Sequence, residues 1–162
     1  MSKILKVKEA IKIAQELRKQ NKSIVLTGGC FDIIHVGHVI FLSRAKQRGD
    51  VLFVLLECDE KVKRLKGNNR PINSQQDRAL VISAISSVDF VVMLTNLKTD
   101  SEYDKIITKI HPSIIAATAN DPNIKHKKRQ AKLINGKIAY VSKRVAEQST
   151  TRIASLTKIE AL

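Results

Sequence analysis

The stretch "SIVLTGGCFDIIHVGH", residues 23–38, decides the fold and places the candidate site. It opens as a short apolar run that ends in glycines, which predicts a buried strand over 23–28. A helix over 38–48 is expected to follow, with Phe41, Leu42 and Ala45 facing inward and Gly49 ending it. Two of the chain's four histidines, His35 and His38, therefore follow the carboxyl end of this strand.

The same alternation of strands and helices continues along the chain. Further strands are expected at 51–57, 88–94, 113–118 and 137–142, and helices at 7–20, 75–86, 101–110, 124–134 and from Ser149 or Thr150 to Leu162. The polar segment 58–73 is expected to be a loop with at most one helical turn. The pattern, without internal repeats or a linker, predicts one Rossmann-like, doubly wound α/β domain over 1–162 with a five-stranded parallel sheet. Ligands of such sheets bind beyond the carboxyl ends of the strands.

Composition narrows the class of protein and its partners. The 162 residues are 43% apolar, and 29 Lys and Arg against 15 Asp and Glu give a net charge of +14. This excess of positive charge favours a polyanionic partner, such as nucleic acid, an anionic membrane or a phosphate-rich small molecule. The alternative is a solvated lysine-rich surface with no specific partner. The bases are spread out, apart from the run "KHKKRQAK" at 125–132.

The location is expected to be cytoplasmic. The sequence has no 18-residue apolar run and no secretory signal pattern at its N-terminus. Its two cysteines, Cys30 and Cys58, form no framework of repeated spacings, which favours a reducing compartment.

Three interpretations compete for the paired histidines. They could be ordinary capping residues, or they could begin a zinc site, for which Asp32 is nearby although no HExxH pattern is present. They could also donate hydrogen bonds to phosphate, because Gly29 exposes backbone N–H groups before a helix N-terminus and Gly37 leaves room between the imidazoles. The chain has neither a P-loop nor a G-x-G-x-x-G fingerprint.

Three longer matches single out the phosphate interpretation. "GCFDIIHVGHVIFLSRAKQRGDVLFV" (29–54) resembles the HxGH nucleotidylyltransferase superfamily, which is cytidylyltransferase-like, with His35 to His38 as its motif. "KRLKGNNRPINSQQDRALVISAISSVDFVV" (63–92) closely resembles the D-glycero-β-D-manno-heptose 1-phosphate adenylyltransferases, which form the C-terminal half of bifunctional ADP-heptose synthases. "RVAEQSTTRI" (144–153) is similar to an element of the cytidylyltransferase branch. The resemblance covers roughly residues 8–155.

The resemblance implies a reaction and a set of site residues. A nucleoside monophosphate passes from ATP or CTP, which brings Mg²⁺ with it, to a phosphorylated small-molecule acceptor, and pyrophosphate leaves. The implied catalytic residues are His35, His38 and Lys66. Nucleotide binding is implied for Gly29, Cys30, Phe31, Gly37, Arg144, Ser149, Thr150 and Thr151. Acceptor binding is implied for Lys63, Arg78 and Asn120. Asp32 is expected to brace the turn, and relatives are commonly homodimers.

The identity of the acceptor depends on a segment where the chain departs from the heptose enzymes, after its fourth expected strand. Those enzymes carry Lys-Gly-Gly-Asp-Tyr where this chain has Ala117, Thr118, Ala119, Asn120 and Asp121. A heptose 1-phosphate is the first expectation for the acceptor. The alternatives are glycerol 3-phosphate with CTP, FMN with ATP, a nucleotide binder that has lost catalysis, and a basic module that binds nucleic acid.

Overall fold

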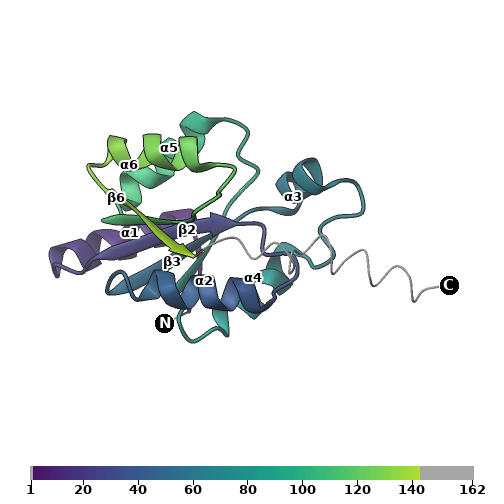
Figure 1. Cartoon of the computed structure of the whole chain (residues 1–162), viewed down its shortest axis with the longest axis horizontal. Helices are drawn as coiled ribbons and strands as arrows, with labels where there is room; N and C mark the ends of the chain where they lie inside the picture. The colour runs from purple at the N-terminus through teal and green to yellow at the C-terminus, as the bar shows by residue number, and fades with distance from the viewer. Residues whose placement is uncertain (1, 143–162) are drawn as a thin grey trace.

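The computed structural model describes residues 2–142 of the chain. Within this range one parallel sheet has the strand order β1-β4-β3-β2-β5-β6 (Figure 1). The strands are β1 (Ile4–Lys6), β2 (Ile24–Gly29), β3 (Val51–Leu56), β4 (Phe90–Met93), β5 (Ile114–Thr118) and β6 (Lys137–Ser142). The helices are α1 (Val7–Lys19), α2 (Val36–Lys46), α3 (Asp59–Lys66), α4 (Gln75–Ser83), α5 (Asp100–Ile110) and α6 (Ile124–Leu133).

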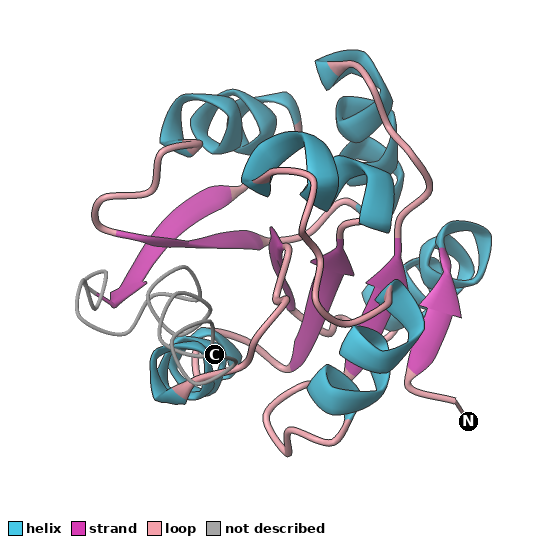
Figure 2. Cartoon of the chain, turned by 90° about the vertical axis from the view of Figure 1, so that its right-hand side faces the viewer, coloured by secondary structure: helices cyan, strands magenta, loops and turns pink. Residues whose placement is uncertain are grey.

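Helices cover both faces of the sheet, which makes three layers (Figure 2). On one face α1, α5 and α6 bury Ala10, Ala14, Ile107, Ile110 and Ala131 against the strands. On the other face α2 and α4 bury Phe41, Leu42, Ala45, Ala79 and Ile82. The Rossmann-like α/β class with a single parallel sheet is thereby confirmed.

The predicted number of strands was wrong, because the sheet has six strands and not five. The additional strand, β1, is only three residues long and has just one buried side chain, Leu5. Its extended form comes from pairing with β4, where Leu5 stands opposite Val92. A segment this short carries no periodicity of its own, so the sequence pattern did not reveal it.

The predicted loop over 58–73 was also wrong in its first half, which forms α3. This helix has Asp59 and Glu60 in its first turn and basic residues in its last turn, the charge order that a helix dipole favours. Only Val62 is buried, so the segment has too little apolar periodicity to be recognised as a helix. The helix extends from the carboxyl end of β3, away from the three layers (Figure 1).

The strand order predicts where a ligand-binding crevice should lie, namely at the carboxyl end of β2. Val25 pairs with Leu52 of β3 on one side and with Ile114 of β5 on the other. The chain moves away from β2 in one direction through β3 and β4, and then returns to its other side with β5, so the order reverses at β2. A crevice for ligands is expected at the carboxyl ends there. Among residues 2–142 no helix has the length and hydropathy needed to span a bilayer.

Candidate active site

The loop after β2 brings both histidines to the start of α2. The helix begins at Val36, two residues earlier than expected, so His35 is its N-cap residue and His38 lies in its first turn. The backbone N–H of His38 donates to the carbonyl of His35 over 2.9 Å. Phe31 in the preceding loop has a left-handed φ of 46°. Such backbone conformations are uncommon outside glycine and are concentrated at functional sites.

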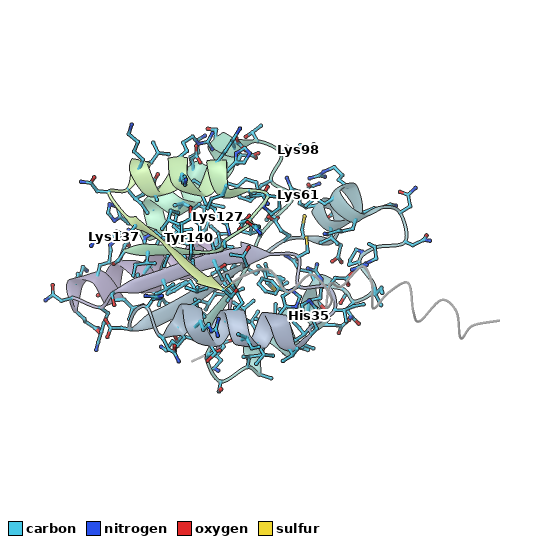
Figure 3. The ribbon with its side chains drawn as sticks, viewed as in Figure 1. His35, Lys61, Lys98, Lys127, Lys137 and Tyr140 are labelled. Atoms are coloured by element: carbon cyan, nitrogen blue, oxygen red, sulfur yellow. The ribbon has the colours of Figure 1, made fainter. Side chains whose placement is uncertain are left out.

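The two imidazole rings are stacked on each other. Their centroids are 3.9 Å apart with an angle of 28° between the ring planes, and the ring of Phe31 lies 5.2 Å from that of His38. A Cβ atom on Gly29 would lie 3.1 Å from the Phe31 ring, so a glycine there allows the ring its place. Figure 3 shows His35 near the carboxyl ends of the strands, on the α2 side of the sheet.

Both histidines are poor bases in this setting. Burial lowers the pKa of His35, and burial together with the neighbouring His35 lowers the pKa of His38 to about 4. The Nδ1 atoms of both rings are buried without a hydrogen-bond partner among the described residues. Unpartnered buried polar atoms are rare, which marks this pair as a candidate functional site. At neutral pH the pair offers neutral N–H donors.

The lowered pKa of His38 makes stability depend on pH in a defined direction. Between pH 6.5 and about 4 the unfolded chain takes up a proton at this residue and the folded chain does not, so acid favours unfolding. From pH 7.5 to pH 4.5 the free energy of unfolding should fall in both proteins. We expect the fall to be roughly 2–3 kcal/mol larger in the wild type than in a His38→Asn variant. Urea titrations at both pH values measure this difference. An equal loss of stability in His38→Asn and the wild type over this pH range would contradict the burial of the His38 imidazole.

Asp32 joins the loop after β2 to the segment that precedes α4. Its buried carboxylate accepts from the backbone N–H groups of Ile72 (2.8 Å) and Asn73 (3.2 Å) and from Nε of Arg70. The side-chain amide of Asn73 donates back to the Asp32 carbonyl over 2.9 Å. The expectation that Asp32 braces the turn is therefore confirmed.

Arg78 on α4 is buried, with only 1% of its surface exposed. Its guanidinium donates to the carbonyls of Cys30, Glu57 (2.9 Å) and Asn73 (3.1 Å) and to the carboxylate of Asp59 (2.6 Å). The predicted role for Arg78 was contact with the acceptor, but the structure engages every guanidinium nitrogen with the protein. An acceptor could reach this group only by displacing one of these partners. Arg78 instead ties together three loops at the carboxyl ends of the strands.

The two predicted lysines lie on α3. Lys63 and Lys66 are exposed, one turn apart, and α3 ends at Gly67, whose φ of 103° favours glycine. Burial raises the pKa of the Cys30 thiol, and the positive charge of Lys66 acts in the opposite direction. The ammonium of Lys66 is therefore within electrostatic range of the loop that carries the histidines.

The loop between β5 and α6, where the heptose pattern is lost, contains Asn120 as an exposed residue. It is shaped by Asp121, whose carboxylate accepts from Lys127 (2.7 Å) and from the backbone N–H of Asn123 (2.8 Å). The predicted nucleotide-binding residues Arg144, Ser149, Thr150 and Thr151, and the helix expected after them, lie outside the described residues.

The basic run 125–132 forms most of α6, and acidic neighbours neutralise part of its charge. His126 and Arg129 pair with Asp100, and Arg129 also contacts Asp104. Lys127 pairs with Asp121. This pairing weakens the case for α6 as a surface that binds nucleic acid.

Glu57 and Tyr103 are polar residues of this region that the sequence did not single out. Glu57 follows β3 directly, and its carboxylate accepts from the Tyr103 hydroxyl at 2.9 and 3.1 Å. The two residues are 46 positions apart on different elements, so no motif connects them. The sequence offered one signal that could have found Glu57. This carboxylate comes directly after a buried strand, and ligands of such sheets bind beyond the carboxyl ends of the strands.

The chain is similar to several known proteins. The model of the family described as cytidylyltransferase-like matches residues 26–159. The bifunctional protein HldE of Wolinella succinogenes is 48% identical over 104 residues, which are 64% of this chain and 21% of that protein. The HldE protein of Campylobacter curvus is 43% identical over 116 residues, 71% of this chain and 24% of that protein. The chain thus spans roughly a fifth to a quarter of the length of these curated relatives.

Two solved structures have similar folds. The lipopolysaccharide core biosynthesis protein of Thermoplasma volcanium superposes with a TM-score of 0.62 at 27% identity, over 75% of this chain and 98% of that one. The pantoate-beta-alanine ligase of Francisella tularensis superposes with a TM-score of 0.60 over 100% of this chain and 79% of that one. At 17% identity the second likeness concerns the fold alone.

Proposed function

Because the chain belongs to the cytidylyltransferase-like family, we propose that it is a nucleotidyltransferase that moves a nucleoside monophosphate to a phosphorylated acceptor. The observation that carries the proposal is the stacked pair of His35 and His38 in the first turn of the helix that follows the central strand. A helix N-terminus and two imidazole donors together suit a bound phosphate chain.

The proposed reaction needs alignment and charge stabilisation more than it needs a base. An oxygen of the acceptor phosphate forms a bond to the α-phosphorus of the triphosphate, and the bond from that phosphorus to the departing pyrophosphate breaks. A phosphomonoester has its second pKa near ~6, so it is largely dianionic at neutral pH and needs no proton removed. The protein must hold two polyanions in line and stabilise the charge on the transferring phosphate.

The site residues divide this work in the proposal. His35 and His38 donate to the triphosphate, with His38 nearest the α-phosphate, and Lys66 links the triphosphate to the acceptor phosphate. The loop of Gly29, Cys30 and Phe31 and the helical Gly37 provide the nucleotide surface, joined by Arg144, Ser149, Thr150 and Thr151. Lys63 and Asn120 face the acceptor, while Arg78 and Asp32 hold the loops in place.

The triphosphate is expected to arrive as its Mg²⁺ complex, so the metal is part of the substrate. Residues 2–142 contain no group of three His, Cys, Asp or Glu side chains that could form a metal cage. Mg²⁺ commonly keeps its waters and takes substrate phosphates as ligands, which suits such a site.

The proposed acceptor is a sugar phosphate such as heptose 1-phosphate. The support is the match to the HldE proteins, with 48% identity over 104 residues to that of Wolinella succinogenes. The altered loop 117–121 keeps glycerol 3-phosphate with CTP and FMN with ATP as alternatives. We also propose that residues 1–162 form a single domain, that the protein is cytoplasmic and that it forms a homodimer.

A pyrophosphate-release assay tests the proposal. ATP, CTP, GTP and UTP are each combined with sugar 1-phosphates including heptose 1-phosphate, glycerol 3-phosphate, phosphocholine, phosphoethanolamine and FMN. We expect release that needs both substrates, is highest with ATP and the heptose 1-phosphate, and stops in excess chelator.

Other results of this assay identify the alternatives. No release from any pair, with thermal stabilisation by a triphosphate, would indicate a binder without catalysis. A salt-sensitive shift with RNA or DNA that survives His38→Ala would indicate a nucleic-acid module.

A further inference from the structure

The carboxylate of Glu57 lies at the carboxyl edge of the sheet, beside the loop that carries the histidines. Glu57 is the first residue after β3, and its backbone N–H donates to the carbonyl of Gly29 over 3.1 Å. Its negative charge helps to raise the pKa of the Cys30 thiol, after the larger effect of burial. The carboxylate is therefore a neighbour of the proposed nucleotide loop.

Tyr103 holds this carboxylate in place. The phenol, carried by α5, donates to the two Glu57 oxygens at 2.9 and 3.1 Å, and the ammonium of Lys61 lies 5.4 Å from the centre of its ring. Burial and the nearby carboxylate raise the pKa of Tyr103, so it remains a donor. In the view of Figure 3 Lys61 lies above the ends of the strands and His35 below them.

The carboxylate keeps unused capacity to accept hydrogen bonds. A carboxylate offers about four lone-pair positions, and a phenol supplies a single proton. Among the described residues no lysine or arginine nitrogen forms an ion pair with Glu57, although the charges of Lys61, Arg64 and Arg78 act on it. Burial raises the pKa of this carboxyl, and the bond from Tyr103 opposes that shift.

A half-buried carboxylate is unfavourable in a site that binds only phosphates, because like charges repel. It is favourable where the ligand presents hydroxyl groups, since O–H donors to a carboxylate make strong, short bonds. Lys61 and Arg64 on α3, whose positive charges act on the Glu57 carboxylate, supply the charge that a phosphate requires. The region thus combines cations for a phosphate with an acceptor for hydroxyls.

We propose that Glu57, held by Tyr103, binds the hydroxyl groups of the acceptor, and that the acceptor is a phosphorylated polyol or sugar. The inference rests on the proposed nucleotidyl transfer and adds the residue that selects the acceptor. Glu57 is an acceptor-binding residue and takes no part in bond making. Tyr103 is a positioning residue that acts through Glu57.

A Glu57→Gln variant tests this in the pyrophosphate-release assay. We expect its KM for the sugar phosphate to rise by about 10–100-fold, the effect of losing a charged hydrogen-bond partner. Its kcat and its KM for the triphosphate should stay within about twofold of the wild type. Tyr103→Phe should raise the acceptor KM about three- to tenfold, because the carboxylate remains but is less well placed. Glu16→Gln, which removes an exposed carboxylate on α1, is the matched control.

Direct binding separates failure of this inference from failure of the proposed reaction. Calorimetry with D-mannose 1-phosphate, phosphoethanolamine and inorganic phosphate should show the sugar phosphate bound about tenfold or more tightly than the other two. Glu57→Gln should lose this preference, whether or not the wild type turns over any acceptor.

Four results would overturn the inference: an unchanged acceptor KM in folded Glu57→Gln, an equal rise in the triphosphate KM, no preference for the sugar phosphate in the wild type, or an unchanged preference in the variant. Absence of turnover with every acceptor, together with an intact binding preference, would refute the proposed reaction and leave the hydroxyl site standing. If Glu57→Gln does not fold, Tyr103→Phe decides, and an unaltered acceptor affinity in it would overturn the inference.

Discussion

Replacing His38 with alanine should lower turnover by about 10²–10³-fold, the usual cost of losing one preorganised donor to a transition state. His38 is held between His35 and Phe31, with ring centroids 3.9 and 5.2 Å away, so its imidazole is already placed before substrate binds. A donor fixed in this way needs no reorganisation when charge develops on the phosphorus. The loss should fall on kcat more than on the KM for the triphosphate, since the bond strengthens in the transition state.

Steady-state pyrophosphate release measures the effect of this substitution, and a thermal melt verifies that the variant is folded. His126→Ala, altered at a histidine on α6 that pairs with Asp100, should keep wild-type kinetics. Wild-type kcat in a folded His38→Ala variant would remove His38 from the reaction.

Replacing Arg78 with methionine should lower the free energy of unfolding by about 3–5 kcal/mol, the range found when one partner of a buried charged network is removed. The substitution leaves the carbonyls of Cys30, Glu57 and Asn73 without this donor and Asp59 without its ion pair. Methionine has a similar length, so the lost hydrogen bonds and charge dominate over a lost volume.

Urea unfolding at neutral pH measures the change in stability. Arg64→Met is the matched control, because Arg64 is exposed and its guanidinium only approaches the Leu97 carbonyl, at 3.5 Å. It should change stability by less than about 1 kcal/mol, as surface substitutions usually do. An Arg78→Met variant as stable as the control would show that the three loops do not depend on this guanidinium.

The sequence was informative where each element has its own pattern. The apolar runs that became β2 to β6 were recognised, as was the helix that begins after Ser74, whose hydroxyl accepts from the Asp77 N–H. The HVGH motif was recognised because its two histidines and glycine lie within four consecutive residues. Asp32 was interpreted correctly as a brace, although its partners Arg70, Ile72 and Asn73 lie far along the chain and could not be identified from the sequence.

What could not be predicted depends on partners far away in the sequence. β1 exists through its pairing with β4, and α3 through favourable charge order along a helix with one buried side chain. Arg78 looks like an acceptor ligand until its partners at positions 30, 57, 59 and 73 are seen together. The bond between Glu57 and Tyr103 likewise crosses two elements, so only the folded chain reveals it.

The strand order also has a consequence for how the protein acquires its binding crevice during folding. β2 and β3 pair across a short stretch of chain, with Val25 opposite Leu52, whereas β2 meets β5 through Val25 and Ile114, 89 positions apart. The chain entropy lost in closing a loop grows with its length, and contacts distant in sequence slow the search for the native state. We therefore expect the β2–α2–β3 unit to assemble early and the docking of β5 to come late. The point where the strand order reverses would then be completed only in a late stage of folding.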